Sequence, residues 1–102
     1  MDLKTIREKV RKSEFDLSEH AHKERQIEKI SIKEIKQTIL GNDIIEEYIN
    51  DPRGSSCLIG NEDLHVVCGF RANRLLIVTT YRPEEPVWID YKTRVKELKN
   101  RV

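Results

Sequence analysis

Apolar residues in the first part of the chain recur at helical spacing among charged residues. Leu3, Ile6 and Val10 lie three or four positions apart, which predicts an amphipathic first helix. Ser18 is a typical helix N-cap residue, and it predicts a second helix that continues to about Ile30.

A third helix is indicated by a capping box, in which Ser31 is followed three positions later by Glu34. Gly41-Asn42 is a typical C-terminal cap and ends this helix. The apolar stripe of the helix consists of Ile32, Ile35, Ile39 and Leu40. Residues 15–17, between the first two helices, are expected to form only a short extended link.

From residue 44 the apolar pattern changes to the shorter period of β-strands. Helices followed by a meander of strands predict an α+β fold, with N-terminal helices packed on a four-stranded, mainly antiparallel sheet. Pro83 and Pro86 end the last strand, and residues 88–101 hint at a short closing helix. The four predicted strands, separated by turns, are Ile44–Ile49, Cys57–Gly60, Leu64–Phe70 and Leu75–Tyr81.

Length and composition are those of one small domain. The 102 residues match the commonest domain size, so residues 1–102 are expected to form a single domain. Lys and Arg (19) nearly cancel Asp and Glu (18), which leaves a net charge of +1 and no bulk attraction for nucleic acid. A phosphate-binding surface would have to come from local clustering. The high content of Lys, Glu and Ile resembles the composition of thermophile proteins, whose surfaces are rich in ion pairs.

The sequence shows no targeting or membrane segment. No apolar run approaches the roughly 20 residues that span a bilayer. The first 13 residues are charged throughout and contain no signal-peptide core. We therefore expect a cytoplasmic protein that has no membrane partner.

The two cysteines fit neither a CxxC zinc pattern nor a disulfide framework, so the simplest interpretation is two reduced, partly buried thiols. If Glu62 and Asp63 form a two-residue turn, the adjoining strands pair so that Cys57 lies opposite Cys68. Opposed residues have Cβ atoms about 5 Å apart, which would also allow a strained disulfide. Both states stay open, because cytosolic disulfides are realistic mainly in hyperthermophiles.

His20 and Glu24 lie four positions apart on the predicted second helix, so their side chains share one face with Ile27. This face could simply border the core, with His20 hydrogen-bonded and Glu24 solvated. Alternatively, Glu24 orients His20 and raises its basicity, as is usual for a general base. Arg25 points away from His20 and is either a surface residue or a phosphate contact.

His65 lies in an apolar strand segment, where an imidazole needs a hydrogen-bond partner. It is either a satisfied structural histidine or a functional group. Tyr81 and Arg82 end the last strand just before Pro83, where side chains often project from the rim of a sheet. Tyr81 could equally be a core aromatic residue with its hydroxyl at the edge.

Arg53 lies in a tight turn between Pro52 and Gly54. Turn arginines are usually solvated, but Arg also suits forked phosphate contacts, and a neighbouring glycine lets a ligand approach the backbone. The chain carries no Walker loop, dinucleotide fingerprint, HExxH motif or nucleophile elbow. Any chemistry must therefore come from scattered residues that act together.

These segments, taken in order, resemble the family called the domain of unknown function forty-two fifty-eight. The resemblance covers about residues 17–90, ends at Trp88 and leaves residues 1–13 as an extra N-terminal helix. Many members carry Arg where this chain has Glu24 and Glu28, and the acidic version matches a sub-group with HAxxER. The segments are His20-Ala21-x-x-Glu24-Arg25, Ile45-Glu46-Glu47-Tyr48, Asp51-x-Arg53-Gly54-x-Ser56-Cys57-Leu58, Leu64-His65-Val66-Val67-Cys68 and Thr80-Tyr81-x-Pro83.

The resemblance implies a relation to the BrnT and RelE toxins, and with it a RelE/BrnT-like fold in the barnase-like group of ribonucleases. The implied function is an endoribonuclease of the mRNA interferase type, the toxin of a type II toxin–antitoxin system. Its substrate would be RNA, including ribosome-associated mRNA. Its partner would be a small antitoxin protein with a CxxC zinc finger. The oligomeric state stays open.

The expected reaction is attack of the ribose 2′-hydroxyl on the adjacent phosphate, without a metal or other cofactor. It requires a base, an acid and positive charge near the phosphate. His20, supported by Glu24, and His65 would transfer protons, and Tyr81 would stack a base or donate a hydrogen bond. Arg53 and Arg82 would stabilise charge, with Arg25 as a further phosphate contact.

Two other functions are compatible with the same residues. A non-catalytic binding or regulatory module of the same fold fits the near-neutral charge and the aromatic content of 6%. A metal site built from His20, Glu24 and His65 also has suitable ligand chemistry.

Overall fold

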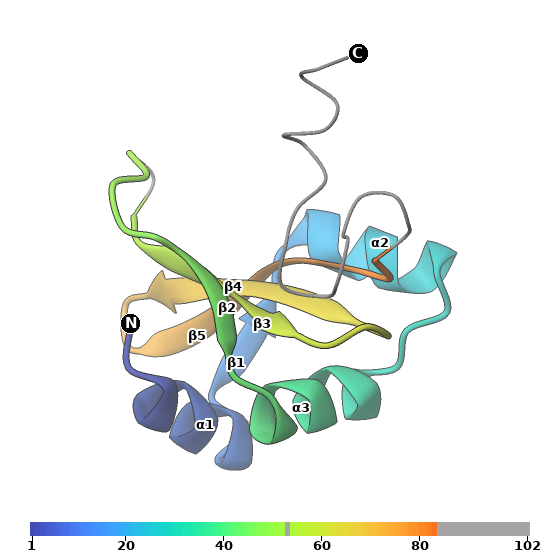
Figure 1. The fold of residues 1–102 in the computed structure, drawn as a ribbon, viewed down its shortest axis with the longest axis horizontal. Coiled ribbons are helices and arrows are strands. Elements are labelled where there is room, and N and C mark those ends of the chain that lie inside the picture. Colours follow the sequence, from blue (N-terminus) through green and yellow to red (C-terminus); the bar gives the residue numbers. More distant parts are fainter. Residues whose placement is uncertain (53, 84–102) are drawn as a thin grey trace.

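The structure is a computed structural model that describes residues 1–52 and 54–83. Figure 1 shows α1 and α3 together on one side of the sheet, so the predicted α+β fold is confirmed. The predictions for Arg53, Pro86 and residues 88–101 lie outside the described residues. The elements are α1 (Leu3–Arg11), β1 (Phe15–Leu17), α2 (Glu19–Ile27), α3 (Ile32–Gly41), β2 (Ile44–Tyr48), β3 (Ser56–Gly60), β4 (His65–Arg71) and β5 (Arg74–Tyr81).

Side-chain caps begin the helices where the sequence predicts them. The Ser18 hydroxyl accepts a hydrogen bond from the Ala21 amide at the start of α2, and Ser31 does the same for Glu34 at the start of α3. Asp2 caps α1 in the same way, by accepting from the Lys4 amide. Within the described residues, no helix is long and apolar enough to cross a membrane.

The second helix ends at Ile27, three residues earlier than predicted. Lys29 has a φ of 57°, in the left-handed region. The Lys29 amide donates to the Gln26 carbonyl and the Ile30 amide donates to the Arg25 carbonyl, which is the Schellman pattern of hydrogen bonds. The same motif ends α1 at Ser13, also at a φ of 57°. Glycine usually marks such a stop, and neither position carries one.

The sheet has five strands, in the order β1-β5-β4-β3-β2, so the prediction of four strands is wrong. The additional strand is β1, which pairs parallel to β5 with Phe15 opposite Leu75. The other three pairings are antiparallel. A strand of three residues is too short to show an alternating pattern, and its partner lies about sixty positions away. Local sequence therefore indicated only an extended link.

The register of β3 and β4 agrees with the predicted turn. The Asn61 amide donates to the Leu64 carbonyl across the turn, and Cys57 lies opposite Cys68. Both thiols are free and buried, with 3.9 Å between their sulfur atoms. Their hydrogen bond lowers the pKa of Cys57 and raises that of Cys68, which burial raises further.

One face of the sheet, here called the covered face, packs against α1 and α3 (Figure 1). The opposite face, here called the open face, carries the alternate residues of the same strands. α2 follows β1 and runs beside β5. At its start the Ser18 amide donates to the Ile77 carbonyl, and at its end the Glu28 carboxylate accepts from the Arg82 amide. The core of the covered face includes Ile6, Val10, Ile35, Ile39, Cys57, Ile59, Val66, Cys68, Leu75 and Ile77, all 0% exposed.

Candidate functional site

The open face brings together two of the predicted functional side chains. His65 on β4 lies directly opposite Tyr81 on β5, and the distance from His65 Nδ1 to the Tyr81 hydroxyl oxygen is 3.3 Å. The two rings meet edge to face, with centroids 5.3 Å apart and planes inclined by 67°. His65 is 0% exposed, whereas Tyr81 is half-buried. The imidazole therefore contacts a side chain that itself reaches toward solvent.

Close backbone packing fixes the position of His65. Gly60 lies opposite it on β3, and a Cβ atom at Gly60 would be 2.9 Å from His65 Cδ2 and even closer to the Leu64 carbonyl. Any larger residue would therefore displace the ring or the strand. On β5, the buried Thr80 hydroxyl donates to the His65 carbonyl at 2.9 Å. This bond joins the two strands beside the His65–Tyr81 pair.

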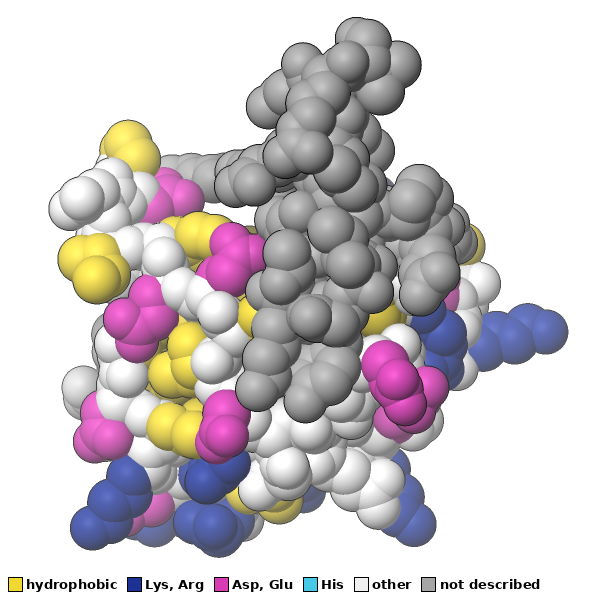
Figure 2. All heavy atoms as spheres, viewed as in Figure 1, with side chains coloured by type: hydrophobic (Ala, Val, Ile, Leu, Met, Phe, Trp, Pro, Cys, Tyr) yellow, Lys and Arg dark blue, Asp and Glu magenta, His cyan; other side chains and the backbone are white. Residues whose placement is uncertain are grey.

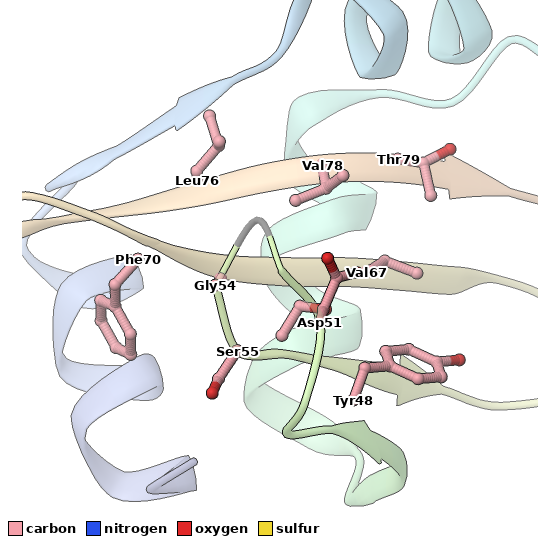
Figure 3. Close-up of a pocket in the computed structure, with 11 residues that line it drawn as sticks. Tyr48, Asp51, Gly54, Ser55, Val67, Phe70, Leu76, Val78 and Thr79 are labelled. Carbon is pink, nitrogen blue, oxygen red and sulfur yellow. The ribbon is translucent and has the colours of Figure 1, made fainter.

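A hollow of about 480 Å³ adjoins this pair on the open face. Val67 and Thr79, which face each other across β4 and β5, lie two positions from His65 and Tyr81 and line the hollow. Figure 3 shows β4 and β5 behind the hollow and the loop between β2 and β3 in front of it. Its lining consists of Tyr48, Asp51, Gly54, Ser55, Ser56, Val67, Gly69, Phe70, Leu76, Val78 and Thr79.

The sequence did not single out the residues of this hollow. Tyr48 and Asp51 belong to segments of the family resemblance, but no local pattern gave either a role. A two-residue alternation in β4 does predict that Val67 shares a face with His65. The contribution of the β2–β3 loop could not be predicted, because it depends on how that loop folds back toward the sheet.

The predicted pair on α2 is not joined by a polar bond. His20 is exposed and Glu24 is half-buried, and no hydrogen bond or ion pair between described residues joins them. A comparable contact on this helix joins His22 and Gln26 at 3.4 Å, each two positions after the corresponding residue of the predicted pair. In this conformation Glu24 does not orient His20.

Arg82 is engaged in an ion pair. Its two terminal nitrogens lie 2.8 and 2.9 Å from the two carboxylate oxygens of Glu34, a forked geometry. The same guanidinium donates to the carbonyls of Glu28 and Lys29. The ion pair lowers the pKa of Glu34 and raises that of Arg82, since each partner stabilises the charged form of the other. A phosphate at Arg82 would have to compete with this pair.

Arg25 is also engaged within the protein. Its guanidinium donates to the Ile30 carbonyl at 3.2 Å, which secures the link between α2 and α3. Arg53, the third predicted phosphate contact, lies outside the described residues. Among the residues that the structure describes, no three His, Cys, Asp or Glu side chains are arranged to hold a metal ion. His20, Glu24 and His65 therefore do not form a ligand set in this conformation.

The chain belongs to the family described as Domain of unknown function (DUF4258), whose model matches residues 17–82. The match starts in β1 and ends just after β5, so it includes His65, Tyr81 and the hollow. It leaves out α1. No curated protein and no solved structure matches the chain.

Proposed function

We propose that this member of the family is a ribonuclease of the toxin type, related in fold to RelE and BrnT, that cleaves RNA at the open face of its sheet. The observation that carries the proposal is the 3.3 Å contact between His65 and Tyr81 beside the hollow. Both side chains can transfer protons, and the hollow adjoining them offers room for part of a substrate.

In the proposed reaction, Tyr81 and His65 act in series as the base. The Tyr81 hydroxyl takes the proton of the attacking ribose 2′-hydroxyl and passes its own proton to His65 Nδ1. The 2′-oxygen then bonds to phosphorus as the bond to the 5′-oxygen breaks. A relay of this kind suits a buried imidazole, because only Tyr81 needs to reach the RNA.

The remaining roles follow the sequence prediction. His20 would protonate the departing 5′-oxygen, and Arg53 would stabilise charge on the phosphate. His20 is exposed, as access to RNA requires. The products would be a 2′,3′-cyclic phosphate and a 5′-hydroxyl. The partner that restrains this activity would be a small antitoxin protein in the same cytoplasm, with a CxxC zinc finger.

A non-catalytic binding module is the second candidate, and the charge distribution favours it. Two of the three arginines expected to bind phosphate, Arg25 and Arg82, are engaged in bonds within the protein. Figure 2 shows the visible Lys and Arg side chains of the described residues along the lower part of the view and at its right-hand side. Such a module would bind a partner protein through the same open face and leave RNA intact.

Cleavage of RNA by the purified protein, alone and on translating ribosomes, separates the two candidates. Fragments should be sequenced and their ends tested for the cyclic phosphate. We expect His65→Gln and His20→Gln each to slow cleavage by about 10²- to 10⁴-fold, as is typical when a proton-transfer group is lost. His22→Gln is the matched control, because His22 is exposed on the same helix and has no proposed role. Intact RNA in both assays would contradict the ribonuclease and leave the binding module.

A further inference from the structure

The hollow on the open face combines an apolar floor with a polar rim. Val67, Leu76 and Val78 supply aliphatic side chains from the two central strands. The aromatic ring of Tyr48 lies at the rim of the hollow (Figure 3). The hydroxyl of Thr79 lies at the end of the hollow that is nearer to Tyr81 along β5. A volume of about 480 Å³ lies within the range of roughly 300–1,000 Å³ that is typical of small-molecule sites.

The described lining of the hollow carries a negative charge and no positive one. Among the lining residues that the structure describes, Asp51 is the one charged side chain. Figure 3 shows its carboxylate over the strands, whereas the Ser55 hydroxyl points away and donates to the Ile49 carbonyl. A carboxylate repels phosphate but accepts hydrogen bonds from N–H groups.

These properties match a nucleobase and do not match the RNA backbone. An unstacked base has two flat faces that pack on aliphatic and aromatic side chains, and polar edges that hydrogen-bond. Two adjacent N–H donors can meet both oxygens of one carboxylate in a forked arrangement. Guanine has such a pair, its N1–H and N2–H₂ groups, and the other common bases do not. A carboxylate has about four acceptor positions, so Asp51 can accept from a base while it keeps other partners.

The position of the hollow agrees with this ligand. Val67 lies two residues beyond His65 on the same strand face, which is a separation of about 7 Å along the strand. A nucleotide with its base in the hollow can therefore place its own ribose and phosphate near Tyr81. The bound base would fix the position of the RNA strand on the protein, and the cleaved bond would be next to the nucleotide whose base lies in the hollow.

We propose that the hollow binds a single unstacked guanine of single-stranded RNA, with the Watson–Crick edge of the base on Asp51. This assignment rests on the proposed ribonuclease function and deepens it, because it names the base next to which cleavage occurs. Tyr48 covers one side of the base, and Val67 and Val78 support the other.

The test uses oligonucleotides that bind but cannot be cleaved. Short uridine oligomers with 2′-O-methyl riboses lack the attacking hydroxyl, and one central position is varied among G, A, C, U and inosine. Binding is followed by fluorescence anisotropy. We expect the G oligomer to bind about tenfold or more tightly than the others, since a good forked contact discriminates bases by at least about that factor. Inosine, which lacks the N2 amino group, should lose most of this preference.

Asp51→Asn should remove the preference for G, because an amide cannot accept two hydrogen bonds side by side. Asp43→Asn is the matched control, since the Asp43 side chain is 91% exposed and lies outside the hollow. Val78→Phe fills the hollow without touching the carboxylate and should weaken all oligomers. Amide resonances of Val67, Leu76 and Val78 should shift when the G oligomer is added to the wild-type protein.

Equal binding of all oligomers, or a G preference that survives Asp51→Asn, would overturn the guanine site. If cleavage depends on His65 but oligomer binding does not depend on Asp51, the proposed ribonuclease function stands and only the guanine site is contradicted. If the protein binds the G oligomer selectively but cleaves no RNA, the guanine site stands and the ribonuclease function is contradicted. A small partner protein that shifts the same resonances while no oligomer does would also overturn the site.

Discussion

The two faces of the sheet are built from the same strands but from different kinds of side chain. On the covered face, Ile59, Cys68 and Ile77 are fully buried against the helix layer. On the open face, the neighbouring residues form the His65–Tyr81 contact and the hollow. Because successive side chains of a strand alternate in direction, one strand can serve the core and the site separately. Substitutions one position apart should therefore have different consequences.

The largest effect on stability is expected from a substitution in the core of the covered face. Ile77→Ala should lower the free energy of unfolding by about 2–5 kcal/mol, because it leaves a cavity beneath the helices. Val78→Ala, one position later, should cost much less, since Val78 is half-buried and lines the hollow. Urea unfolding followed by circular dichroism measures both. Equal losses at the two positions would contradict the division of the sheet into two faces.

A smaller effect is expected where the sheet meets α3. Arg82 lowers the pKa of Glu34 from its ordinary value of 4.5, so the ion pair stabilises the folded protein above that pH. This stability should be lost as the pH falls through the lowered pKa of the folded state. Glu34→Gln should reduce the free energy of unfolding at neutral pH by about 1 kcal/mol or less, because the pair is partly exposed.

The pH dependence provides the measurement for this ion pair. Unfolding free energies of the wild type and of Glu34→Gln should converge as the pH falls through the lowered pKa of Glu34, because the wild-type carboxylate then becomes protonated. Glu19→Gln is the matched control, because Glu19 forms an exposed pair with Lys23 on α2. A difference between the Glu34 variant and wild type that persists unchanged in acid would show that the side chain acts through packing and not through its charge.

The smallest effect is expected when thiol reagents are added to the native protein, because the two cysteines should react only slowly. Cys57 and Cys68 lie on the covered face and are both 0% exposed, so a water-soluble reagent should reach them only when the sheet opens. Labelling of the native protein should be slow and should speed up in parallel with unfolding by urea. Rapid labelling of both thiols under native conditions would mean that the helix layer does not seal this face.

Much of the fold could be predicted because its determinants are local. Ser18 and Ser31 mark helix starts through bonds to amides three positions away, and a two-residue turn brings Cys57 opposite Cys68. The pairing of β1 with β5 and the bond of Arg82 to Glu34 join distant positions, and no local pattern reports them. The end of α2 was missed because Lys29 occupies a position that glycine usually marks.

For the candidate site, too, the local features could be predicted and the long-range contacts could not. His65 could be noticed because an imidazole is unusual in an apolar strand, and Tyr81 because it ends the last strand. Their contact depends on the register of β4 and β5, which a bulge near Val67 shifts. His20 and Glu24 were paired from helical spacing alone, and spacing permits a contact without requiring one.

The most direct test of the account compares two neighbouring hydroxyl groups on β5. The Thr80 hydroxyl bonds to the buried His65 carbonyl, and the Tyr81 hydroxyl bonds to the His65 ring. Single-turnover cleavage of a G-containing RNA should be measured for Thr80→Val and Tyr81→Phe, together with urea unfolding. We predict that Thr80→Val lowers the free energy of unfolding by about 1 kcal/mol and changes cleavage only slightly. Tyr81→Phe also removes a hydrogen bond of the buried His65 group and should cost a similar amount of stability, but it should slow cleavage by about 10²-fold or more. Cleavage by Tyr81→Phe at the wild-type rate would contradict the assignment of the chemistry to the open face.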